Sequence, residues 1–226
     1  MANNTRRKDN DRRPAIARPH LPPASAAKSL FDDQLIDHGV YTDLILSSVG
    51  LAGQTAQRPT FESVVFRNAS LSATVLPGVH LRDVQLDTCD LAEAEWEHAD
   101  LARVELLSCR MLGFKASEAL IQDAVFKECD GRYAVLFSAR FKAVRFERCM
   151  LGEASFQEAD LSGVIFRDCD LSQADLRGAK LTGADFRGSR VEGMRVGPAD
   201  VRGAIIEPAQ AIAFAGLLGL DVRFEA

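Results

Sequence analysis

A large apolar residue recurs at every fifth position from Phe61 to Ile206, without one insertion. Of these 30 positions, 28 hold a large apolar side chain, and Ala116 and Gly131 are the exceptions. The position two residues earlier is mostly Ala, Val or Cys. An amphipathic helix repeats about every 3.6 residues and a strand about every 2, so either pattern would lose phase within two repeats. The spacing therefore predicts a repeat architecture.

A longer period, of twenty positions, lies on top of the period of five. The cysteines show it most clearly, since they stand at Cys89, Cys109, Cys129, Cys149 and Cys169. A column of large residues shows it too, as Phe126, Phe146, Phe166 and Phe186. Such a period is four pentapeptides long, which predicts a square coil with one pentapeptide on each side. Residues one period apart then stack along the axis, and two of every five residues point inward.

Several five-residue units share one sequence pattern. Residues 159–163 read Ala-Asp-Leu-Ser-Gly, and residues 174–178 read Ala-Asp-Leu-Arg-Gly. This pattern resembles the pentapeptide repeat family, and the matching phase covers about residues 41–206. The resemblance implies an all-β fold, the right-handed quadrilateral β-helix of that family. Thirty-four pentapeptides predict about eight coils and, at the usual strand spacing of about 4.8 Å, a rod about 40 Å long.

The chain divides into three segments. Residues 1–29 are basic and contain four prolines, and they hold too few large apolar residues to compensate the entropy of ordering, so we expect a disordered tail. A basic arm that touches nucleic acid or another anionic partner is the alternative for this tail. Residues 30–206 are expected to form the solenoid, with an N-terminal cap over 30–45. Residues 207–226 are expected to form a C-terminal cap or dimerisation segment.

The C-terminal segment has the features of a short helix. Pro208 suits the first helical position, and residues 209–218 predict a helix with one apolar face. Phe214, Leu217 and Leu218 are the candidate contacts of this helix. We favour capping of the last coil, which is otherwise an exposed edge. The family resemblance implies a second role, because related proteins dimerise through their C-terminal ends.

The repeat also predicts details of packing. Phe114 occupies a small-residue position, its large-residue neighbour is Ala116, and Trp96 lies one coil away from Ala116. Such exchanges conserve core volume. On the surface, charges of alternating sign stand one predicted coil apart, which predicts ion pairs between adjacent coils. The charge ladders are Lys127, Glu147 and Arg167; Glu128, Arg148 and Asp168; and Asp90, Arg110 and Asp130.

The residues that most often carry chemistry do not form a reactive site in this sequence. A column of thiols with an axial spacing of about 4.8 Å points in parallel and does not converge as zinc ligands must, so we expect buried packing residues. The four histidines have no partners in the sequence that suggest a catalytic triad, and glycines fall at coil corners, where turns need them. We expect no enzyme, no cofactor and no metal. No apolar run is long enough to span a membrane and no secretory signal is evident, which favours the cytoplasm.

The charge distribution is uneven. The net charge is −5 overall, yet residues 81–130 hold 12 acidic and 5 basic residues, whereas residues 131–206 hold 10 acidic and 12 basic residues. We call the centre of the acidic region the acidic collar, and we take it as a candidate interaction surface. Its members are Asp83, Asp87, Asp90, Glu93, Glu95, Glu97 and Asp100.

Two functions fit these observations. The first is a non-catalytic scaffold or interaction module that binds a protein partner, because a rigid rod offers flat faces. The second is implied by the resemblance, since some family members are DNA mimics that bind DNA gyrase or topoisomerase and protect it from inhibitors. DNA carries about one charge per 1.7 Å, which the acidic region matches locally and the whole rod does not. The collar acids also spread over four sides. We expect no direct binding of nucleic acid and no membrane contact.

Overall fold

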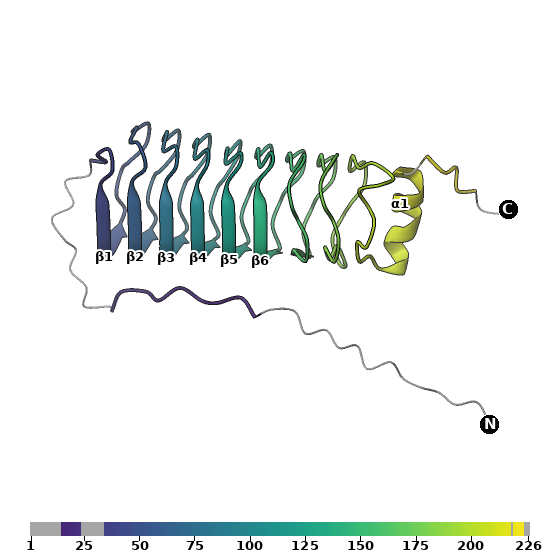
Figure 1. Ribbon diagram of the computed structural model, residues 1–226, viewed down its shortest axis with the longest axis horizontal. Coiled ribbons are helices and arrows are strands. Elements are labelled where there is room, and N and C mark those ends of the chain that lie inside the picture. The colour runs from purple at the N-terminus through teal and green to yellow at the C-terminus, as the bar shows by residue number, and fades with distance from the viewer. Residues whose placement is uncertain (1–14, 24–33, 218, 224–226) are drawn as a thin grey trace, which may run out of the picture.

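The computed structural model describes residues 15–23, 34–217 and 219–223. Seven parallel strands form one sheet in the order of the chain (Figure 1). They are β1 (Val40–Ser47), β2 (Thr60–Arg67), β3 (His80–Asp87), β4 (Asp100–Leu107), β5 (Leu120–Lys127), β6 (Arg140–Glu147) and β7 (Ile165–Arg167). Each paired strand residue faces the residue twenty positions later, for example Val64 and Val84. The predicted coil of four pentapeptides is therefore confirmed.

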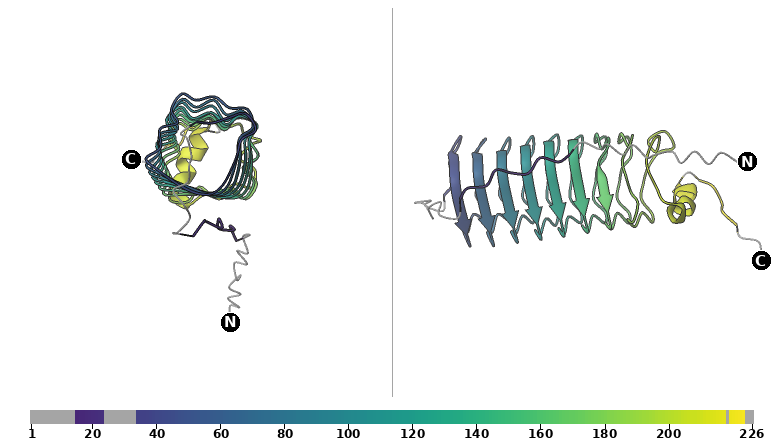
Figure 2. Two further views of the ribbon diagram at one scale, coloured as in Figure 1. Left: turned by 90° about the vertical axis from the view of Figure 1, so that its left-hand side faces the viewer. Right: turned by 90° about the horizontal axis from the view of Figure 1, so that it is seen from below.

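Seen along its axis, the stack has a four-sided outline (Figure 2), so the quadrilateral β-helix is confirmed. The continuous sheet covers about six turns, fewer than the eight coils that we predicted. Single backbone bridges extend the same register as far as the bridge between Asp185 and Ile205. The strands shorten where the corner residue becomes glycine. Gly163 and Gly183 have φ values of 72° and 74°, against 53° for Asp123 in β5, because glycine tolerates a wider range of left-handed conformations.

The interior consists of stacked apolar side chains. The phenylalanine column runs along the axis with nearly parallel rings, whose centroids lie 4.6 Å apart for Phe126 and Phe146, 5.1 Å for Phe146 and Phe166, and 5.2 Å for Phe166 and Phe186. These separations are close to the spacing of adjacent strands. The small-residue column is buried as well, from Val64 to Val164, so both repeat columns point inward.

The expected exchange of volume occurs in the middle of the rod. Phe114 lies inside, and its ring contacts the indole of Trp96 edge to face at 5.4 Å. Ala116 is fully buried beside them. The indole Nε1 of Trp96 donates a hydrogen bond of 3.1 Å to the hydroxyl of the buried Thr74. Two aromatic rings therefore fill the space that a large residue at position 116 would occupy.

The charge ladders form only in part. Two predicted rungs are present, Glu128–Arg148 at 2.6 Å and Asp90–Arg110 at 3.0 Å. The rung from Lys127 to Glu147 is replaced by a pair within one coil, because Arg145 donates to Glu147 at 2.9 Å. A side chain two positions away on the same coil can thus compete with the side chain one coil away.

The ends of the rod are closed differently. At the N-terminal end, Leu35 is buried and its backbone N–H donates to Gln54 Oε1, while residues 30–33 of the expected cap lie outside the described residues. At the C-terminal end, a 3₁₀ turn (Pro208–Gln210) precedes helix α1 (Ala211–Leu217). The expected α-helix therefore starts two residues late. Among the described residues, no helix is long and apolar enough to cross a membrane.

Candidate interaction surface

The acidic collar encircles the rod and does not form one face. Its members stand on β3, on the following turns and at the start of β4. Three of them are paired with a base one coil later: Asp83 with Arg103 at 2.5 Å, Asp90 with Arg110 at 3.0 Å and Glu95 with Lys115 at 2.7 Å. Each base follows its acid by one full period of the sequence, so the spacing could have shown that much of the collar charge is neutralised.

Asp83 is the most enclosed acid of the collar, with a side chain only 8% exposed. Arg103 donates to its two carboxylate oxygens from Nε and Nη2, at 2.6 and 2.5 Å. This bidentate arrangement is the main reason that the pKa of Asp83 falls from 3.8 to about 2. The carboxylate is therefore a buried anion that organises its surroundings, and it is accessible to a partner only where the chain that covers it moves away.

The other collar acids point to separate parts of the surface. Asp87 accepts a hydrogen bond from the Thr88 hydroxyl, and the Asp100 carboxylate lies 3.7 Å from His80 Nδ1. Glu93 and Glu97 are exposed. A role of the collar as an interaction surface stays a prediction, and Asp83 is its one member that is almost fully covered.

Sequence reasoning missed the segment that covers Asp83. Residues 15–23, which we name the docked segment, lie alongside the rod (Figure 1). Its backbone N–H groups at His20 and Ala17 donate to Asp83 at 2.9 Å and Asp123 at 3.2 Å. Ser63 donates from its hydroxyl to the carbonyl of His20 at 3.1 Å. The disordered tail over residues 1–29 stays a prediction, although the structure places residues 15–23 against the rod, where rod side chains bond their backbone groups. Residues 1–14 and 24–29 of the expected tail lie outside the described residues.

The sequence did contain a signal for this segment. Within it, only Ile16, Pro19 and Pro22 are partly buried, and the other described residues are exposed. A period of three is typical of the polyproline II conformation, which has three residues per turn. Proline at two of the three partly buried positions fits that conformation, but a search for periods of five and twenty does not detect it.

A groove of about 1150 Å³ lies beside the same corner of the rod and extends towards its C-terminal end. Basic side chains predominate along it, with Arg82, Arg103, Arg140 and Lys142 against Asp100 and Asp160. The small corner residues Ala143, Gly163 and Gly183 also line it. Leu120 stands in it with 48% of its surface exposed. The groove therefore combines cations with an exposed large apolar side chain.

The C-terminal candidate residues lie at the end of the rod. Phe214 is 6% exposed, and its ring centroid is 6.2 Å from that of Phe186 in the last stacked column. Leu217 is the last residue of α1, and Leu218 lies outside the described residues. Before the helix, the buried amide of Gln210 donates to the carbonyl oxygens of Phe186 and Ser189, at 2.7 and 2.6 Å. This amide satisfies carbonyl groups that a further coil would otherwise bond.

The five cysteines are free and buried. Each thiol lies within hydrogen-bond distance of a carbonyl, as Cys129 Sγ does with Leu106 O at 3.4 Å. The neighbouring thiols of Cys109 and Cys149, together with burial, raise the pKa of Cys129. Among the residues that the structure describes, no three His, Cys, Asp or Glu side chains gather in a way that could hold a metal ion. The column consists of packing residues.

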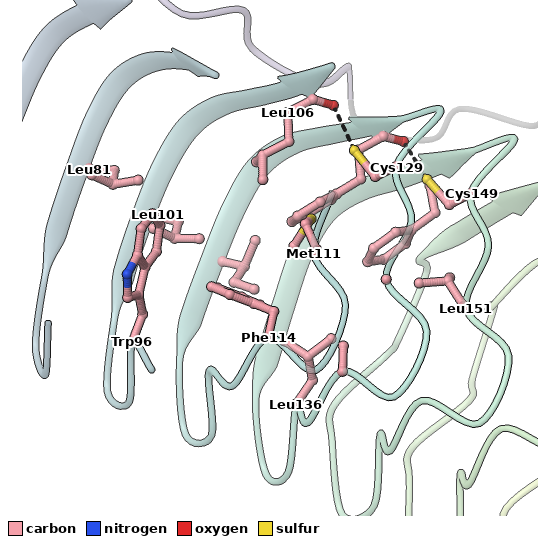
Figure 3. A pocket seen from close by; sticks show the side chains of 15 residues that line it. Leu81, Trp96, Leu101, Leu106, Met111, Phe114, Cys129, Leu136, Cys149 and Leu151 are labelled. Carbon is pink, nitrogen blue, oxygen red and sulfur yellow. Dashed lines mark hydrogen bonds between the residues drawn. The ribbon is translucent and has the colours of Figure 1, made fainter. Parts of the chain in front are cut away.

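One small cavity of about 20 Å³ lies inside the rod (Figure 3). Apolar side chains surround it, including Met111, Phe114, Leu136 and Leu151, and Gly131 stands where the repeat calls for a large residue. A cavity of this size and polarity has no polar groups to hold a substrate or an ordered water. It is a packing defect.

The stacked four-sided coil, with two inward residues in every five, defines the class of quadrilateral β-solenoids. Two family models match the sequence: the pentapeptide repeat region over residues 99–164, and pentapeptide repeats, in eight copies, over residues 154–193. The repeat is unbroken through both ranges, so residues 99–193 are identified as pentapeptide repeats. No curated protein matches the sequence.

Solved structures of similar fold include other pentapeptide repeat proteins. QnrB1, a plasmid-mediated fluoroquinolone resistance protein, is 21% identical over 80% of this chain and 100% of its own, with a TM-score of 0.38. HetL is involved in the regulation of heterocyst differentiation in the cyanobacterium Nostoc sp. strain PCC 7120. It is 22% identical over 75% of this chain and 87% of its own, with a TM-score of 0.39. At these identities the likeness concerns the fold alone.

Proposed function

We propose that the protein is a non-catalytic scaffold that binds a protein partner along its outer surface. The observation that carries this proposal is the groove beside the β3–β6 corner, where Leu120 is half exposed between Asp100 and Arg140 of the adjacent coils. An exposed apolar side chain within a polar rim is typical of protein contact sites. The continuous backbone ladder keeps these groups at fixed positions, so a partner meets a preorganised surface.

DNA mimicry is less well supported by the geometry. A mimic presents unpaired negative charge along one face, whereas Asp83, Asp90 and Glu95 each pair with a base of the next coil. A gyrase supercoiling assay, with and without a fluoroquinolone, tests this alternative. Neither inhibition nor protection at micromolar protein would reject it.

Capture of partners from the native host, with the full chain as bait, tests the scaffold proposal. We expect Leu120→Glu to lose a stoichiometric partner that the unchanged protein retains, because a charge replaces the apolar contact in the groove. Met150→Glu is the matched control, since Met150 is also outward-facing and 45% exposed but lies outside the groove. A bait that retains no stoichiometric partner, or loses it equally in both variants, would contradict the proposal.

A further inference from the structure

The docked segment meets the rod at one corner, and the spacing of its contacts matches the spacing of the coils. We name Ser63, Asp83, Arg103 and Asp123, which stand one coil apart from each other on β2 to β5, the corner track. Asp83 and Asp123 are two coils apart, which is about 9.6 Å at the usual strand spacing. The N–H groups they accept belong to His20 and Ala17, three positions apart, which span about 9.3 Å in polyproline II.

The pattern of burial gives the same register independently of the hydrogen bonds. Ile16, Pro19 and Pro22 turn towards the rod, and Ala15, Leu21 and Pro23 are exposed. An extended chain with three residues per turn presents every third side chain to one surface. One full turn of such a chain therefore corresponds to two coils of the solenoid, and the match can continue for as many coils as the corner offers acceptors.

Apart from the His20 side chain, whose Nδ1 lies 3.4 Å from Asp83 Oδ1, the hydrogen bonds use groups that any peptide of this conformation possesses. Two backbone N–H groups and one backbone carbonyl are bonded by side chains of the rod. Arg103 holds the Asp83 carboxylate in place from the far side, so the acceptor is oriented before a peptide arrives. The track therefore recognises an extended backbone and an apolar residue at every third position.

The groove continues this path beyond Asp123, where Arg140 and Lys142 line it. Within the described residues, neither of these two cations has an ion pair with an acid. The sequence that precedes the docked segment supplies Arg12 and Arg13, which have the same charge as the groove. An acidic residue at the corresponding place in a partner would instead be complementary.

We propose that the corner track is a binding site for an extended, proline-containing peptide of a partner protein. Acidic residues of this peptide lie on the N-terminal side of its proline-containing part. Residues 15–23 are the resident occupant of this site, and the partner peptide displaces them. This inference rests on the proposed scaffold function and names the class of partner. A weak intramolecular ligand raises specificity, because only a peptide that competes with it gains access.

The first experiment follows the resident segment in the full chain by hydrogen exchange at the amides of Ala17 and His20. We expect Asp123→Gly to raise the exchange rate at Ala17 about tenfold, because it removes a charged acceptor. Glycine suits the left-handed corner, as Gly163 and Gly183 do in the same column. Asp168→Gly is the matched control, at another corner with a φ of 54° and with glycine in the next coil. Equal exchange in both variants would overturn the assigned contact.

The second experiment measures the anisotropy of fluorescent synthetic peptides with the full chain. One peptide is residues 14–23, and a second carries two aspartates before Pro14. We expect the acidic peptide to bind about tenfold more tightly than the peptide of residues 14–23. We also expect both peptides to bind the Ile16→Asp, Pro22→Asp protein more tightly than the unchanged protein, because the two substitutions loosen the resident segment. Ala15→Asp with Leu21→Asp adds the same charge on the exposed side of the segment and should leave the affinities unchanged.

Absence of peptide binding to the Ile16→Asp, Pro22→Asp protein, with its amides in fast exchange, would overturn the peptide site. Equal affinity of the two peptides would overturn the acidic specificity. Both outcomes leave partner capture through Leu120 untouched, so they are distinguishable from a failure of the scaffold function. Conversely, peptide binding without a captured partner would reject only the scaffold function.

Discussion

At the scale of single residues, the ion pair of Asp83 and Arg103 stabilises both the stacking of adjacent coils and the attachment of the docked segment. The carboxylate binds the guanidinium of the next coil and the backbone of the docked segment together. Its pKa is lowered to about 2, first by the hydrogen bonds from Arg103 and further by His20, against the opposing effect of burial. Because the folded pKa lies below the unfolded value, the ionised form stabilises the fold above about pH 4. That stabilisation is lost as the pH falls towards 2.

We therefore predict that Asp83→Asn lowers the free energy of unfolding at pH 7 by about 2 kcal/mol, the value of the pKa shift. The difference between Asp83→Asn and the unchanged protein should shrink steadily between pH 4 and pH 2. Urea denaturation at several pH values measures both effects. Asp87→Asn is the control, because Asp87 lies on the same coil and its hydrogen bond is with the neighbouring Thr88. A loss that does not depend on pH would show that the Asp83 charge does not stabilise the fold.

A second residue-scale feature is the gap in the core at Gly131. A Cβ atom built there would lie 3.0 Å from Leu151 Cδ2, the flexible end of a side chain that borders the cavity. Gly131 also lies outside the left-handed region, so a larger residue adds no backbone strain. We predict that Gly131→Ala raises the free energy of unfolding by about 0.5–1 kcal/mol, by filling space and restricting the unfolded chain.

Ala116 is the opposite case, because Trp96 and Phe114 already fill the space beside it. Ala116→Leu should lower the free energy of unfolding by about 1–3 kcal/mol through overpacking. Thermal and urea unfolding of Gly131→Ala and Ala116→Leu measure the change in the free energy of unfolding for each variant. If Gly131→Ala destabilised the protein as much as Ala116→Leu, the cavity would not be available to a methyl group.

At the scale of elements, the cysteine column acts as part of the backbone pairing of the rod. Its last position is Ser189, whose hydroxyl donates to Phe166 O at 3.1 Å and accepts from the backbone N–H of Cys169 at 3.0 Å. Cys149 makes the equivalent contact with Phe126 O. A thiol and a hydroxyl thus make the same contact, so packing and hydrogen bonding account for the column without redox chemistry.

We predict that none of the five thiols reacts with Ellman's reagent in the folded protein, and that all five react in guanidinium chloride. Burial removes them from the reagent, and the raised pKa of Cys129 leaves its reactive thiolate scarce. The measurement is the absorbance of the released thiolate, counted per chain. Fast reaction of one thiol at neutral pH in the folded state would identify an exposed or activated cysteine and contradict the packing role.

The elements also show what a sequence can predict. The coil register, the inward columns and the exchange between Phe114 and Ala116 follow from spacing, because each coil must stack on the next. The docked segment does not follow from it, since Ile16 and Pro19 belong to a different period. The pairing of Glu147 with Arg145 was also missed, because the reach of a long side chain is not encoded in the repeat.

At the scale of the whole molecule, the rod is a parallel stack whose two ends are sheet edges. A stack of this kind could pair with another copy unless its ends are covered. Gln210 and Phe214 cover the last coil, yet the same C-terminal segment keeps large apolar side chains exposed at Ile212, Leu220 and Val222. Two roles are therefore separated within one short segment: an inner side that caps the rod and an outer side that is free for contact.

The final prediction uses this separation to distinguish capping from dimerisation. Phe214→Asp places a charge against Phe186 and should lower the melting temperature and promote association of uncovered ends. Ile212→Asp changes a residue that is 49% exposed, so it should leave the melting temperature unchanged. If the outer side is a dimer interface, as the family resemblance implies, the same substitution should convert the dimer into a monomer. Light scattering and thermal unfolding of both variants measure these outcomes. A monomeric mass for the unchanged protein would reject the dimer, whereas a stable Phe214→Asp protein would reject the cap.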